Sequence, residues 1–208
     1  MRAVLFDVDG VVVHGFHADP ARQRRWNAHL AEDLGIDPEA FNETFIRGPF
    51  ARDVIPGRRS LVAALEETLP TLGFTGSPLT VIAYWLSRDS QLNLPLLDQI
   101  RRLRRRGDAG LFLATNQEHL RAAHLWGTLG LGHVFDDIFH SARLGAAKPH
   151  SDFFEAVSKR LAPQEQPPLL FDDSPAVVDA ANAFGWEAVL YGEIGDFVDH
   201  PWIAPRIS

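Results

Sequence analysis

Two carboxylates directly follow the first apolar run of the chain. The run at residues 3–6 leads into Asp7, one valine separates Asp7 from Asp9, and Gly10 comes next. A continuous apolar run that a glycine closes is typical of a strand buried on both faces. Side chains alternate along a strand, so Asp7 and Asp9 can point the same way if the chain is still extended there. Two like charges held close together are unfavourable without a cation, which indicates a hard metal such as Mg²⁺; the alternative is a simple turn that ends the strand.

Three later apolar runs also end in polar residues of particular kinds. Thr115 and Asn116 follow the run at residues 110–114, Lys148 lies in the loop after residues 135–141, and Asp172 and Asp173 follow residues 168–171. Each has a structural explanation of its own: a helix cap, a solvated loop cation and a capped helix start with acids near the positive end of its dipole. In a parallel sheet, however, the carboxyl ends of the strands share one edge, where all these side chains would meet. That convergence favours a catalytic site over independent structural causes.

The elements that must position these residues alternate along the second half of the chain. Strand-like apolar runs at residues 110–114, 135–141, 168–171 and 187–191 are separated by helix-like segments at residues 94–106, 117–129, 151–161 and 174–184. This alternation predicts an α/β fold with a Rossmann-like, mainly parallel sheet and helices on both faces.

A helical insertion is expected between the first strand and the rest of the sheet. Residues 20–34, 37–45, 60–72 and 77–86 show helical spacing of their apolar side chains, and no buried strand is evident from residue 14 to residue 90. We therefore expect two domains: residues 1–13 and 91–208 form a Rossmann-like core, and residues 14–90 form an all-helical cap.

Composition narrows the function classes. The chain has 208 residues, a formal net charge of -7 and no cysteine. The negative charge argues against nucleic-acid binding, and the missing thiols exclude disulfides and cysteine nucleophiles. No apolar stretch approaches the ~20 residues of a membrane span, and Asp7 interrupts the early run that could resemble a signal peptide. We expect a cytoplasmic protein without nucleic-acid or membrane partners, either a monomer or a homodimer.

The four junctions together resemble the haloacid dehalogenase-like (HAD) hydrolase superfamily, and within it the phosphatases with a helical cap after the first strand. The residues that carry the resemblance are Asp7-Val8-Asp9-Gly10-Val11, Thr115-Asn116, Lys148-Pro149 and Asp172-Asp173-Ser174, in the order of the family's signatures. The resemblance implies that Asp7 is a nucleophile forming an aspartyl-phosphate and that Asp9 is the general acid and base.

The same resemblance implies the remaining roles. Mg²⁺ would be bound by Asp7, the Asp9 backbone carbonyl and Asp173, with Asp172 acting through water or orienting the other ligands. Gly10, Thr115, Asn116 and Lys148 would bind the substrate, and Thr115 and Lys148 would also serve catalysis at the phosphoryl group. The implied function is a Mg²⁺-dependent phosphomonoester hydrolase of a small phosphorylated metabolite. The Asp172-Asp173 pair is similar to the sugar-phosphatase branch and favours a sugar phosphate.

Some features stay open at this stage. The family often has an acid or Asn four residues after its metal-binding Asp, where this chain has Val177. Arg47 is the cap cation to test first for substrate contact, and His17 is more simply a polar loop residue. A phosphomutase or a dehalogenase of the same fold, or a non-catalytic binding protein, remains an alternative. A receiver-type phosphoacceptor fits the order of motifs poorly.

Overall fold

The computed structural model describes all 208 residues and is built around a five-stranded parallel sheet. Its strands lie in the order β5-β4-β1-β6-β7. Their bounds are β1 Arg2–Phe6, β4 Ala109–Thr115, β5 Asp137–His140, β6 Leu169–Asp172 and β7 Glu187–Leu190. Every pairing in this sheet is parallel, and β1 lies in the middle, between β4 and β6. All five strands therefore end at the same edge, as the predicted α/β fold requires.

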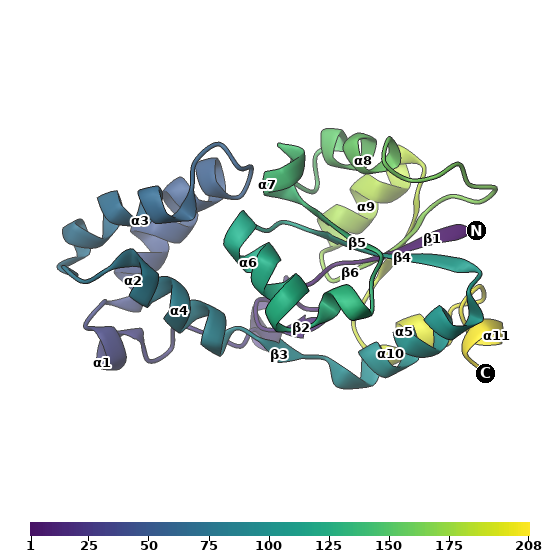
Figure 1. Cartoon of the computed structure of the whole chain (residues 1–208), viewed down its shortest axis with the longest axis horizontal. Helices are drawn as coiled ribbons and strands as arrows, with labels where there is room; N and C mark the ends of the chain where they lie inside the picture. The colour runs from purple at the N-terminus through teal and green to yellow at the C-terminus, as the bar shows by residue number, and fades with distance from the viewer.

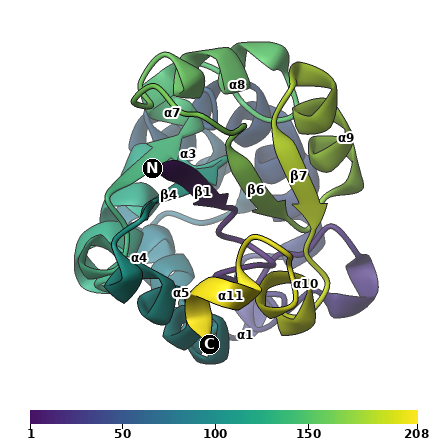
Figure 2. The ribbon, with the colours of Figure 1, turned by 90° about the vertical axis from the view of Figure 1, so that its right-hand side faces the viewer.

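Alternate residues of β1 point into two different cores, which explains why its apolar run is unbroken. Val4 and Phe6 belong to one buried cluster, which includes Ile100 of α5. Ala3 and Leu5 belong to another, which includes residues of α8 and α9. Figure 2 shows α8 and α9 on one side of the sheet and α5, α10 and α11 on the other. The helices that accompany the sheet are α5 Leu94–Arg106, α6 His119–Ala123, α7 Ser141–Leu144, α8 Ser151–Ser158, α9 Pro175–Phe184, α10 Ile194–Val198 and α11 Ala204–Ile207.

Residues 15–90 form a separate group of helices at one end of the molecule, which we call the helical body (Figure 1). The remaining residues are the sheet body. The α-helices of the helical body are α1 Leu30–Leu34, α2 Pro38–Phe41, α3 Leu61–Thr68 and α4 Pro78–Arg88, and a π-helical segment spans Asn42–Val54. It has its own buried cluster, which includes Phe41, Phe45 and Leu65. Both chain termini lie on the sheet body, at the end away from the helical body.

The expected helix at residues 20–34 is wrong for most of its length. Only a short 3₁₀ turn at Pro20–Arg22 and α1 are helical there. Between them the backbone N–H of Arg24 donates to the carbonyl of Gly15 (2.8 Å), and the Trp26 ring packs edge-on against Phe41. The segment turns inward so that Trp26, which is partly buried, packs on the helical body's core, and this tertiary packing overrides the helical spacing.

The two connections between the bodies lie side by side. Strand β2, Val13–His14, pairs antiparallel with β3, Gln91–Leu92. The Asn93 side chain also donates to the carbonyl of Val11 (2.9 Å). The expected boundaries at residues 13 and 91 fall in this strand pair, and the assignment of residues 14–90 as a cap stays a prediction. None of the helices combines the length and the apolar character that crossing a membrane demands.

Candidate active site

The residues singled out at the four junctions meet at the carboxyl edge of the sheet. Asp7 follows β1, Thr115 ends β4, and Asp172 ends β6. Lys148 reaches them from the loop between α7 and α8. A cavity of about 670 Å³ opens over this edge and is lined by Asp7, Asp9, Thr115, Asn116, Lys148, Asp172 and Asp173. Gly10 lies beneath Asp173 and does not line it.

A buried lysine joins two of the carboxylates. The Nζ atom of Lys148 lies 2.9 Å from Oδ1 of Asp7 and 2.6 Å from Oδ2 of Asp172. Burial raises the pKa of Asp7 to about 8; Lys148 opposes the shift, and the neighbouring carboxylates of Asp172, Asp9 and Asp173 add to it. Burial also disfavours the Lys148 charge, but Asp172 and Asp7 outweigh it and hold the pKa of Lys148 above its ordinary value. The single ammonium group of Lys148 therefore lies among four acidic side chains, those of Asp7, Asp9, Asp172 and Asp173.

Three of those acids are placed to share a cation. Asp7, Asp172 and Asp173 each present a carboxylate oxygen, and these oxygens lie within 4.8 Å of one another. Such a set of hard oxygen donors with surplus negative charge fits Mg²⁺. Gly10 allows this arrangement: its φ is +82°, and a Cβ at this position would collide with the carboxylate of Asp173. Glycine is therefore required both by the backbone conformation and by the close approach of Asp173.

The support of Asp173 comes from the start of the helical body. Its Oδ2 accepts a hydrogen bond from the backbone N–H of Ala18 (2.6 Å) and lies 3.4 Å from Nδ1 of His17. Val177, at the position where the family often has an acid or Asn, lies in the first turn of α9, where it is buried in the core and borders the cavity. His17 is thus a polar loop residue, as expected, and it is also a buried neighbour of the acid cluster.

Asn116 fixes the loop that carries the lysine. Its side-chain oxygen accepts from the backbone N–H of Lys148, and its amide donates to the carbonyl of Lys148, both at 2.9 Å. Thr115 is buried at the end of β4 and faces the cavity. These contacts place Asn116 behind the lysine, where it holds the loop against the sheet edge.

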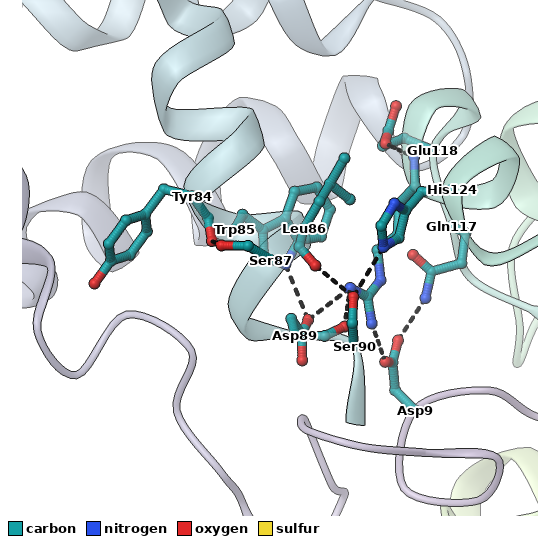
Figure 3. Close-up of polar contacts among 11 residues, drawn as sticks. Asp9, Tyr84, Trp85, Leu86, Ser87, Asp89, Ser90, Gln117, Glu118 and His124 are labelled. Carbon is teal, nitrogen blue, oxygen red and sulfur yellow. Dashed lines mark hydrogen bonds and ion pairs between the residues drawn. The ribbon is translucent and has the colours of Figure 1, made fainter. Parts of the chain in front are cut away.

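Both carboxylate oxygens of Asp9 are engaged. Oδ1 accepts from Nη2 of Arg121 (2.7 Å), and Oδ2 accepts from the side-chain amide of Gln117 (Figure 3). Arg121 also contacts Asp89, which ends the last helix of the helical body. The sequence interpretation included Asp9 but missed Gln117, Asp89 and Arg121.

The helical body supplies the opposite wall of the cavity. This wall is mainly apolar and includes the aromatic side chains of Phe45, Phe50 and Trp85. Arg47 also borders the cavity, but its side chain is exposed and forms an ion pair with Glu43. The charged side of the cavity therefore comes from the sheet body, and the mainly apolar side comes from the helical body.

The raised pKa of Asp7 predicts how metal binding affects stability at different pH values. The pKa of Asp7 is about 8 in the folded state and 3.8, its ordinary value, in the unfolded chain, so the folded state holds the proton more tightly. The stability that this proton contributes is therefore lost as the pH rises through about 8. A divalent cation bound at this acid cluster would pair with the ionised carboxylate and restore that stability. At about 100 times its Kd, Mg²⁺ should raise Tm by about 5–10 °C near pH 8.5. The increment should be clearly smaller near pH 5, as thermal unfolding with Mg²⁺ or with a chelator would measure. Equal increments at the two pH values would contradict this account.

Comparison with known proteins identifies relatives that match most of the chain. A family model described as haloacid dehalogenase-like hydrolase matches residues 1–185. The fructose-1-phosphate phosphatase YqaB of Escherichia coli (strain K12) is 31% identical over 188 residues, which are 89% of this chain and 94% of that protein.

Two solved structures share the fold. A HAD-like family hydrolase from Porphyromonas gingivalis superposes with a TM-score of 0.73 at 23% identity, covering 99% of this chain and 97% of its own. A HAD family enzyme from Bacteroides thetaiotaomicron, in complex with magnesium and inorganic phosphate, gives a TM-score of 0.71 at 18% identity, with 90% and 92% covered. At these identities the likeness shows the architecture of the sheet and helices.

Proposed function

The chain belongs to the haloacid dehalogenase-like hydrolase family, and from this premise we propose that it hydrolyses the phosphomonoester of a small metabolite with the help of Mg²⁺. The observation that carries the proposal is the buried contact of one lysine with two carboxylates, Asp7 and Asp172, beside the metal-donor set. In this proposal residues 1–13 and 91–208 are the catalytic core, and residues 14–90 are the cap that selects the substrate.

The first half of the reaction transfers the phosphoryl group to the protein. A carboxylate oxygen of Asp7 attacks phosphorus, and the bond from phosphorus to the ester oxygen breaks. Asp9 gives its proton to that departing oxygen, so that a neutral alcohol leaves. Lys148 and the hydroxyl of Thr115 stabilise the negative charge on the phosphoryl oxygens during the transfer.

The second half restores the free carboxylate. Asp9, now ionised, takes a proton from a water molecule as that water attacks phosphorus. The bond between phosphorus and the Asp7 oxygen breaks, and inorganic phosphate leaves. Asp9 thereby returns to its protonated state, and the cycle is balanced without any further reactant.

Asp7, Asp173 and the backbone carbonyl of Asp9 are the proposed Mg²⁺ ligands. When bound, the ion supplies charge neutralisation that lets an anionic phosphate approach a cluster of carboxylates. Asp172, which accepts from Lys148 and from the backbone N–H of Ser174 (3.0 Å), orients the lysine. Gly10 contributes by letting Asp173 lie against the backbone.

A sugar phosphate is the substrate class we test first. The curated relative is named for the hydrolysis of fructose 1-phosphate, and it covers nearly the whole of this chain. A cavity of about 670 Å³ also has room for a compound of that size beside the acid cluster.

The test is a panel of phosphorylated sugars, nucleotides and small acids, assayed for release of inorganic phosphate with Mg²⁺ or with a chelator. We expect at least one member to be hydrolysed, and the chelator to abolish its hydrolysis. Transfer of phosphate to a second acceptor, seen by phosphorus NMR, would instead identify a phosphomutase. Activity on haloacids that survives the chelator would identify a dehalogenase, and no activity at all would favour a binding protein.

A further inference from the structure

A buried arginine outside the family's signature residues connects the helical body to Asp9. Arg121 lies on α6, and its side chain is only 1% exposed. Its Nη2 lies 2.7 Å from Oδ1 of Asp9. Its Nη1 lies 2.9 Å from Oδ2 of Asp89 and donates to the carbonyl of Asp89 at 2.8 Å. The guanidinium thus holds a residue of the proposed catalytic apparatus on one side and the end of α4 on the other (Figure 3).

Asp89 lies at the junction of the two bodies. It directly follows α4, and β3 begins two residues later. Trp85 of α4 donates its indole N–H to Oδ2 of Asp89 (2.9 Å), and the Arg121 guanidinium lies over the Trp85 ring, 5.1 Å from its centre. The other connection passes close by, since a Cβ on Gly15 would collide with the carboxylate of Asp89. Any rotation of the helical body about its two connections therefore moves the groups that hold Arg121.

Arg121 has a second carboxylate partner, so its contact with Asp9 can be broken without leaving the guanidinium unpaired. A buried guanidinium needs a carboxylate partner at all times, because an unpaired buried charge is strongly unfavourable. Two contacts to Asp89 keep Arg121 paired when Asp9 turns toward a substrate. The Gln117 amide, which holds the other oxygen of Asp9, comes from the same segment just before α6.

We propose that Arg121 is a positioning residue for Asp9 and that, through Asp89, it couples the orientation of Asp9 to the position of the helical body. This inference rests on the proposed function, because it concerns the residue that protonates the leaving alcohol. Arg121 lines the cavity but acts in this role through Asp9, because its guanidinium sets where the Asp9 carboxylate points.

The experiment compares two phosphate esters that depend differently on Asp9. The leaving group of p-nitrophenyl phosphate departs as a stable anion without a proton, whereas an alkyl phosphate such as fructose 1-phosphate, or the best alkyl ester of the panel, needs the proton. Arg121→Met should lower kcat for the alkyl ester about 30- to 100-fold and for p-nitrophenyl phosphate less than about 3-fold, with KM little changed. Arg121→Lys should recover part of the loss, and Asp89→Asn should show the same selectivity with an effect of about 10-fold.

Two comparisons separate positioning from a structural role. In an Asp9→Asn background, Arg121→Met should cost nothing further on the alkyl ester, because its target is already absent. Arg143→Met is the matched control: Arg143 pairs with Asp137 on the surface, and its loss should leave both rates unchanged.

The outcomes distinguish this inference from the proposed function. Equal losses on both esters, or a loss that adds fully to that of Asp9→Asn, would overturn the positioning role while leaving the phosphatase proposal intact. If the unsubstituted protein with Mg²⁺ hydrolyses neither ester nor any panel member, the proposed function falls and this inference falls with it.

Discussion

Asp7→Asn is expected to lower kcat for any phosphate ester that the protein hydrolyses by at least about 10⁴-fold, or about 5.5 kcal/mol in the activation free energy. An amide keeps the shape of the side chain but cannot attack phosphorus. The substitution also removes one carboxyl group from the crowded acid cluster, and Lys148 keeps its second partner, Asp172, 2.6 Å away. The variant should therefore fold normally and still bind inorganic phosphate.

Two measurements check this result. Steady-state phosphate release gives kcat, and calorimetric titration with inorganic phosphate shows that the site is intact. Asp98→Asn, a change of the same kind at a surface ion pair with Arg101, should leave both values unchanged. An Asp7→Asn protein that keeps a tenth of the original kcat would show that another group is the nucleophile.

Lys148→Met should reduce both stability and activity. Methionine fills the space of the lysine but leaves the fully buried Asp172 without its partner, and breaking a buried ion pair of this kind costs about 3–5 kcal/mol. The corresponding fall in Tm is about 6–20 °C. Because the ammonium also neutralises the transferring phosphoryl group, kcat should fall about 10²- to 10³-fold.

A double variant separates the two losses. Lys148→Met with Asp172→Asn removes both charges of the pair, so denaturant unfolding should show part of the stability restored while kcat stays low. Lys159→Met, at an exposed pair with Glu155, should change the free energy of unfolding by less than about 0.5 kcal/mol. If Lys148→Met alone is as stable as the unsubstituted protein, the buried pair does not contribute as described.

The parts of the fold that could be predicted are those whose signals are local. The run before Asp7 is apolar without interruption because β1 is buried on both faces, and the run before Asp172 follows the same rule. A parallel sheet then brings the ends of such strands together, so the meeting of Asp7, Lys148 and Asp172 follows from topology. The segment at residues 20–34 could not be predicted this way, because its path depends on the packing of Trp26 against the distant rings of Phe41 and Tyr84.

The parts of the site that were missed depend on pairings across long stretches of sequence. Arg121 and Asp9 are separated by 112 positions, and no local pattern marks either as the other's partner. One signal was present: Arg121 lies next to the buried Ala122 on the inner face of α6, where an arginine needs a buried acid. His17 does lie in a loop, but its contact with Asp173 could not be predicted because the two residues are far apart in the sequence.

The pairing of β2 with β3 also bears on how such a protein diversifies. Val13 and Leu92 are cross-strand partners, so the segment between them leaves the sheet body and returns to it at nearly the same point. An insertion with adjacent ends can be lengthened, shortened or exchanged without moving the strands that carry Asp7 and Asp172. In the proposed arrangement of core and cap, changes to this insertion can therefore alter which substrate enters without altering the catalytic residues of the sheet body.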